Sequence, residues 1–119
     1  MDERQPDGHI ALSEARALCD RIETQLNGAG LQRGKLAEVE VAAEHLTEQL
    51  EHLVNRYTVE AGGTHSVLRA RQAVDTMRKI LRWIERYGTF APEVEIQQRL
   101  SDAGREATLA LTMLERLTG

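Results

Sequence analysis

Two histidines share one face of a predicted helix. His45 and His52 lie seven residues apart, with Glu48 between them. Imidazole and carboxylate groups are ligand types of zinc sites, but such a site needs further ligands of fitting geometry. The other two histidines, His9 and His65, fall in other segments of the chain. We therefore expect exposed histidines on an acidic helix, with no bound metal and no other cofactor.

The residues around these histidines also do not match the sequence patterns of two kinds of functional site found in helical bundles. Carboxylate-bridged di-metal sites use Glu three residues before His, and here Ala42 and Gln49 occupy those positions. In histidine phosphotransfer domains, the reactive His is followed by Lys at the third residue and Gly at the fourth. Glu48 and Gln49 follow His45 at those places, and a carboxylate there would repel a phosphoryl group. The sequence thus predicts neither activity.

The chain has a single thiol, Cys19. It lies beside Leu18 and Ile22 with no His near it in sequence, so we expect a small buried side chain rather than a nucleophile. One cysteine leaves no intrachain disulfide and suits a reducing compartment, the cytoplasm. The glycine-rich stretch LNGAGLQRG lacks the spacing and the Lys-Ser/Thr ending of a phosphate-binding loop. No feature of the sequence indicates an enzyme or a small-molecule substrate.

Four helices must position these residues. Apolar side chains recur every three or four residues over 11–27, 35–61, 64–88 and 92–118, which is typical of helices rather than strands. Glycines, and Pro92 at the start of the last segment, separate the four. We call the apolar line along which each helix is expected to pack on its neighbours its seam. The predicted seam residues are, in chain order, Ala11, Ala15, Leu18, Ile22 and Leu26, then Leu36, Val39, Ala43, Leu46, Leu50, Leu53 and Tyr57, then Val67, Ala70, Val74, Met77, Leu81 and Ile84, then Ile96, Leu100, Ala103, Ala107, Ala110, Leu114 and Leu117.

Short connections make sequential helices antiparallel neighbours. The sequence therefore predicts an all-α, up-down-up-down four-helix bundle with a shorter first helix. A chain of 119 residues has the size of one domain, which we place at 10–119, after a loose tail over 1–9 that contains Pro6 and Gly8. No apolar run approaches the roughly 18 residues of a membrane span, so we expect no membrane partner.

Charge is distributed unevenly between neighbouring helices. Residues 64–88 carry six basic and two acidic side chains, whereas residues 35–61 carry two basic and six acidic ones. The simpler interpretation is that each helix neutralises the other, with Arg71 and Arg78 best placed for pairing inside the chain. The other interpretation is that the outer basic residues meet an acidic partner or nucleic-acid phosphates. Those residues are Arg69, Lys79, Arg82 and Arg86.

A second line of residues falls outside the seam of each of the last two helices and contains several large apolar side chains. It consists of Ala73, Thr76, Ile80, Trp83 and Tyr87 in one helix, and of Leu109, Leu111 and Met113 in the other. Either these two helices are the central ones and the short first helix covers them, or their ends form a surface for self-association or for a partner. Trp, Tyr and Met are residue types enriched at such surfaces.

We expect a non-enzymatic module for protein-protein interaction, such as an adaptor, chaperone or regulator, whose first candidate partner is a second copy in a homodimer. The expected partner-binding residues are the apolar Ile80, Trp83, Tyr87, Leu109 and Met113, with Arg69, Lys79, Arg82 and Arg86 as a charged rim. The alternative is a nucleic-acid-associated accessory subunit that places the four basic residues on phosphates and stacks Trp83 on a base. A net charge of −4 weighs against that alternative.

Overall fold

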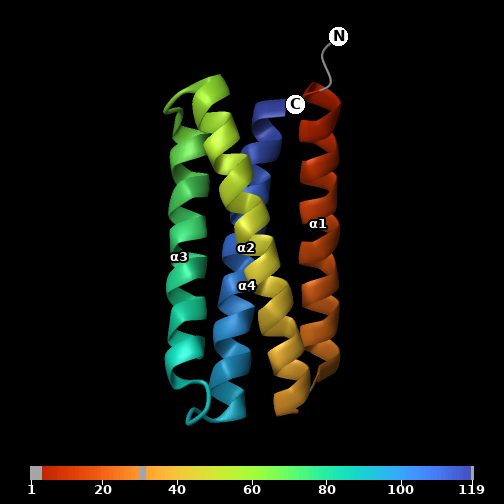
Figure 1. Ribbon diagram of the computed structural model, residues 1–119, viewed down its shortest axis with the longest axis vertical. Helices are drawn as coiled ribbons and strands as arrows, with labels where there is room; N and C mark the ends of the chain where they lie inside the picture. The colour runs from red at the N-terminus through yellow and green to blue at the C-terminus, as the bar shows by residue number, and fades with distance from the viewer. Residues whose placement is uncertain (1–3, 30–31, 119) are drawn as a thin grey trace.

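The computed structural model describes residues 4–29 and 32–118. Within these residues the chain is all-α, with α1 (Arg4–Ala29), α2 (Arg33–Ala61), α3 (His65–Tyr87), α4 (Glu93–Thr118) and no β-strand. The four helices lie side by side along the long axis of a body that measures 49 × 22 × 18 Å (Figure 1). The predicted class, all-α with four helices, is confirmed.

Local signals account for the ends of the helices. The backbone N–H of Val67 donates to Thr64 Oγ1 at 3.4 Å, so Thr64 caps the start of α3. Gly62 ends α2 with a φ of 73°, a backbone conformation that side chains with a Cβ rarely adopt. Glu93 and Glu95 stand in the first turn of α4, where the helix dipole favours negative charge.

The first helix differs from the prediction. α1 has 26 residues and is longer than α3, which has 23, so the expected shorter first helix is wrong. The helix already includes residues 4–9 of the expected tail, while residues 1–3 lie outside the described part of the chain. Pro6 does not prevent this, because it stands in the first turn, where backbone N–H groups have no acceptor within the helix.

The helices do not all contact one another. α2 and α4 contact each other and both remaining helices, whereas α1 and α3 make no contact within the described residues. The two central helices are therefore α2 and α4. Of the two interpretations of the second apolar line, the one that makes the last two helices central, with the first covering them, is right for α4 and wrong for α3. One side of α3 consequently has no helix of this chain to cover it.

The predicted seams form the core. Every seam residue of α2 and α3 is buried, and so are all those of α4 except Leu117, which is half-buried. In α1 two of the buried positions lie one residue later than predicted, because Leu12 and Cys19 are buried while Ala11 and Leu18 are only half-buried. Leu111, considered above as part of a surface stripe, is fully buried.

Candidate functional site

His45 and His52 are both exposed on α2. In the part of the chain that the structure describes, no three His, Cys, Asp or Glu side chains lie close enough together to hold a metal ion. His45 borders a groove of about 530 Å³ between α1 and α2. Gln49 lines the same groove, and its Oε1 atom is buried with no hydrogen-bond partner among the residues that the structure describes.

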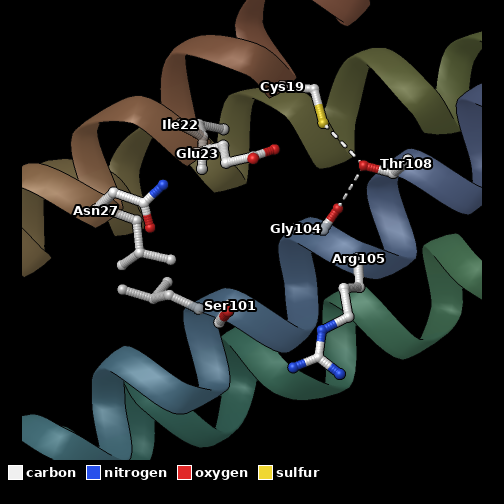
Figure 2. Close-up of a pocket in the computed structure, with 10 residues that line it drawn as sticks. Cys19, Ile22, Glu23, Asn27, Ser101, Gly104, Arg105 and Thr108 are labelled. Carbon is white, nitrogen blue, oxygen red and sulfur yellow. Dashed lines mark hydrogen bonds between the residues drawn. The ribbon is translucent and has the colours of Figure 1, made fainter.

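A second groove, of about 360 Å³, separates α1 from α4 (Figure 2). Cys19 of α1 lies there against Thr108 of α4, with 3.5 Å between the thiol sulfur and the hydroxyl oxygen. That hydroxyl donates to the carbonyl oxygen of Gly104 at 3.1 Å, so its oxygen accepts from the thiol. Cys19 is only 4% exposed, and no His lines the groove. The thiol is thus buried between the two helices, as its apolar sequence neighbours predict.

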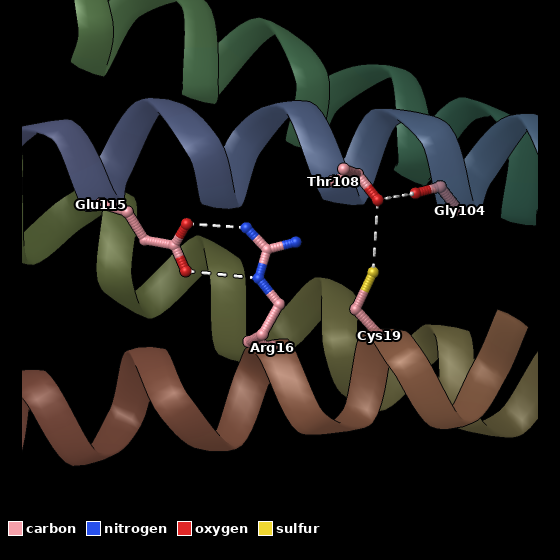
Figure 3. Close-up of polar contacts among 5 residues, drawn as sticks. All are labelled: Arg16, Cys19, Gly104, Thr108 and Glu115. Carbon is pink, nitrogen blue, oxygen red and sulfur yellow. Dashed lines mark hydrogen bonds and ion pairs between the residues drawn. The ribbon is translucent and has the colours of Figure 1, made fainter.

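An ion pair spans the same two helices farther along. Arg16 donates to both carboxylate oxygens of Glu115, from Nη2 at 2.6 Å and from Nε at 3.3 Å (Figure 3). The hydrogen bond to this carboxylate raises the pKa of Arg16 above its ordinary value. A bidentate pair holds two helices in a defined register. No pattern in the sequence indicates this pair, because the partners are 99 residues apart.

Arg33 makes the corresponding connection at the other end of the molecule. Its Nη1 donates to the carbonyl oxygen of Gly88 at 2.6 Å, and its Nη2 donates to the carbonyl oxygen of Ala91 at 3.1 Å and to Glu93 at 2.5 Å. One side chain at the start of α2 therefore bonds to both ends of the connection between α3 and α4. Arg33 falls between the helices predicted at 11–27 and 35–61, and no pattern in the sequence indicates this role.

The expected partner-binding residues fall into three groups. Ile80, Trp83, Leu109 and Met113 are half-buried and pack against the core. Tyr87 is 46% exposed. The four basic residues of the expected rim, Arg69, Lys79, Arg82 and Arg86, are all exposed on α3.

Aromatic residues gather where α3 ends. The rings of Trp83 and Tyr87 lie 5.5 Å apart at a tilt of 51°, a favourable arrangement for an aromatic pair. Phe90, in the connection that follows, is 86% exposed. We call Trp83, Tyr87 and Phe90 the aromatic end. The sequence pattern indicated no role for Phe90, although it stands seven residues after Trp83 and three after Tyr87.

Arg99 covers part of this aromatic end. Its guanidinium carbon lies 4.0 Å from the centroid of the Trp83 ring, a cation-π contact between α4 and α3. The same guanidinium is 3.8 Å from Glu95. One face of the indole ring is therefore occupied within the chain and is not free to stack on a base.

Pairing between the acidic helix α2 and the basic helix α3 is limited. Arg78 donates to both carboxylate oxygens of Glu51, and Arg71 donates to Thr58 Oγ1 at 2.8 Å, so both arginines bond within the chain as predicted. Other pairs between the two helices are absent among the described residues. The expectation that the two helices neutralise each other therefore holds at one ion pair only.

Exposed charges remain on both helices, and they include the acidic Asp75 and Glu85 of α3 beside two rows of like charge. Lys79, Arg82 and Arg86 make no ion pair with any described residue, and neither do Glu44 and Glu48. We call Lys79, Arg82 and Arg86 the basic row, and Glu44 and Glu48 the acidic row. Nearby, burial raises the pKa of the half-buried Glu40, and the Glu44 and Glu85 carboxylates raise it further.

None of the four described helices combines the length and the apolar character that crossing a membrane requires. In comparisons with known proteins, the chain matches no protein-family model, no curated protein and no solved structure.

Proposed function

We propose that the chain is a non-enzymatic module for protein-protein interaction, an adaptor or regulator that contacts a partner protein through the aromatic end. The observation that carries the proposal is the exposure of Tyr87 and Phe90, 46% and 86%, beside the half-buried Trp83. Exposed aromatic residues next to arginines are the composition of interaction hot spots. Ile80 is half-buried one turn before Trp83 and adds to this surface, whereas Leu109 and Met113 lie ten and fourteen residues beyond Arg99 on α4 and are not part of it.

A protein partner fits better than nucleic acid. Arg99 covers one face of Trp83, which weakens the case for base stacking. The acidic row on α2 would repel the phosphates of a nucleic acid that followed the basic row on the neighbouring helix. A single buried thiol agrees with a cytoplasmic location, which is part of the proposal.

The proposal includes the up-down-up-down antiparallel topology. Contacts between α2 and α3 support it, because Thr58 meets Arg71, whereas Glu51, seven residues earlier, meets Arg78, seven residues later. The connection between these helices, residues 62–64, is short, as antiparallel neighbours require. The proposal also includes a homodimer as the working unit.

The aromatic end is tested by affinity purification from cells that produce the protein. We compare the wild type with Tyr87→Ser/Phe90→Ser and with Val94→Ser, a control at a residue that is 60% exposed. A protein recovered in stoichiometric amounts with the wild type and the control, and lost with the double variant, is the expected result. Equal recovery with all three chains, with helical content unchanged, would contradict the proposal.

A further inference from the structure

The connection between α3 and α4 carries one exposed ring on an anchored backbone. It spans residues 88–92, at the end of the bundle where α2 begins (Figure 1). The backbone N–H groups of Phe90 and Ala91 both donate to the carbonyl oxygen of Tyr87, at 3.0 and 2.9 Å. Ala91 is also buried in the core. The backbone around Phe90 is therefore held in place, although Phe90 itself is 86% exposed.

Arg33 restrains the same turn from α2. Its guanidinium group donates to the carbonyl oxygen of Gly88, two residues before Phe90, and to that of Ala91, directly after it. A guanidinium group is planar and presents several donors in a fixed geometry, so one arginine can fix two acceptors relative to each other. Arg33 thus bonds on both sides of Phe90 and sets the position from which its ring projects.

The three rings of the aromatic end differ in what covers them. Arg99 lies on one face of Trp83, and Tyr87 lies beside Trp83 with 46% exposed. Phe90 is the most exposed of the three, so it has the most apolar surface left to bury. A ring on a restrained backbone loses little conformational freedom when it binds, and such preorganised rings are effective anchors of interfaces.

We propose that Phe90 is the anchor of the aromatic end, that it enters an apolar pocket of the partner protein, and that Arg33 is the positioning residue that presents it. The inference rests on the proposed function and deepens it by naming the kind of partner. Because Phe90 projects from a turn at one end of the bundle, the partner supplies the concave side of the interface. Arg33 acts through the backbone of the turn and does not need to touch the partner.

A protein pocket fits this turn better than a lipid surface does. Glu85, in the last turn of α3, and Glu95, in the first turn of α4, are exposed close to the connection in sequence. Anionic lipids at a membrane surface attract basic segments and repel carboxylates. An apolar pocket requires no particular charge around the ring that enters it.

The first experiment asks whether the ring is buried in the complex. Phe90 is the only phenylalanine of the chain, so 4-fluorophenylalanine gives a single fluorine NMR signal from this ring. A soluble gadolinium chelate should broaden that signal in the free protein. The signal should be protected once the protein recovered by the affinity purification is added. A ring that stays equally accessible in the complex would overturn the inference.

The second experiment separates the anchor from the residue that positions it, through the rates of binding to the recovered protein. Phe90→Ser should raise the dissociation rate at least about tenfold, because it removes contacts of the complex. Arg33→Ala should instead lower the association rate about three- to tenfold and leave the dissociation rate within about twofold. Only a fraction of its chains would present the ring, and the apparent affinity falls by that fraction.

The mobility of the turn in the free protein gives an independent measure. The order parameter of the Phe90 N–H group should be about 0.85 in the wild type and below about 0.6 in Arg33→Ala. Arg33→Lys keeps the charge but offers one nitrogen to three acceptors, so it should lie between the two. Lys35→Ala is the control, because it removes a cation two residues away that pairs only with the exposed Glu38.

The outcomes distinguish this inference from the proposed function. If no protein separates the wild type from Tyr87→Ser/Phe90→Ser, the proposed function fails and the inference fails with it. A partner that is lost with Tyr87→Ser and retained with Phe90→Ser would leave the aromatic end as the interface and overturn the inference alone. Equal order and equal rates in Arg33→Ala and Lys35→Ala would do the same for the role of Arg33. Protection of the fluorine signal by phosphatidylserine vesicles, and not by the recovered protein, would identify a lipid surface instead.

Discussion

The guanidinium carbon of Arg99 lies 4.0 Å from the centroid of the Trp83 ring, and this contact joins α4 to the end of α3. A cation above an indole ring is the strongest of the common cation-π pairs. The contact fixes the orientation of the chain's only tryptophan and, through the neighbouring ring of Tyr87, the shape of the aromatic end.

Replacing Arg99 should loosen this end of the molecule without unfolding it. We expect Arg99→Leu to lower the free energy of unfolding by about 0.5–1 kcal/mol, since the charge is lost while the aliphatic contact is largely kept. Urea denaturation followed by circular dichroism measures the loss, and the fluorescence of Trp83 should change in the native state. Arg105→Leu, at an exposed α4 arginine, is the control. Equal effects of the two substitutions would count against a role for the ring contact.

Arg33→Ala should destabilise the connection between α3 and α4. It removes one charged donor from two backbone carbonyl oxygens and one carboxylate, a loss we expect to cost about 1–3 kcal/mol. Amide hydrogen exchange over residues 88–96 should accelerate, while exchange in the middle of α2 stays slow. Lys35→Ala, two residues on, is the control, because Lys35 makes only an exposed pair with Glu38 at 3.8 Å. Unchanged exchange in Arg33→Ala would refute the role of this side chain.

Gln49→Leu should stabilise the protein. The buried Oε1 atom of Gln49 has no hydrogen-bond partner, and leaving such an acceptor unsatisfied typically costs 1–3 kcal/mol, about 1 kcal/mol of which we expect the substitution to recover. Thermal unfolding measures the gain, with Gln72→Leu at an exposed position of α3 as the control. A melting temperature lower than that of the wild type would show that the amide is satisfied in solution.

Glu40 should make stability depend on pH in a defined direction. Burial first, and then the Glu44 and Glu85 carboxylates, raise its pKa in the folded chain above the ordinary 4.5. The ionised form is therefore less favourable in the folded than in the unfolded chain. The contribution of Glu40 to the free energy of unfolding consequently falls as the pH rises from the pKa of Glu40 in the unfolded chain through its pKa in the folded chain. Glu40→Gln should raise the melting temperature at neutral pH by up to about 3 °C.

That gain should disappear in acid. Well below pH 4.5, Glu40 is protonated in both states, and a neutral carboxyl resembles the amide that replaces it. Melting curves of Glu40→Gln and wild type across the acid range measure the difference, and Glu14→Gln, at an exposed residue of α1, is the control. A gain that persists in acid would mean that packing, and not charge, causes it.

Periodicity predicted the core and the four helices well, because burial of one helix face imposes a spacing that is visible in the sequence. The seams of α2 and α3 are the clearest cases, since all their predicted residues are buried. Periodicity was less successful in α1, where apolar residues occupy adjacent positions. The buried residues are Leu12 and Cys19, whereas the prediction chose their neighbours Ala11 and Leu18. It also gave no reason for a helix to begin as early as Arg4.

The candidate site was less predictable for a physical reason. Arg99 meets Trp83 and Arg16 meets Glu115 between different helices, and Arg33 of α2 meets Gly88 in the connection between α3 and α4. These contacts depend on how each helix is rotated about its axis and shifted along it. A helical pattern fixes neither quantity. Phe90 could have been identified from the sequence, because it follows Trp83 by seven residues and Tyr87 by three.

The most direct test of the central claim, assembly through helix faces, is the native mass by light scattering on a size-exclusion column at low salt, with absorbance at two wavelengths. We predict twice the 13.3 kDa of one chain, with no absorbance from nucleic acid. A peak with the mass of one chain at every concentration, or one that carries nucleic acid, would contradict the account.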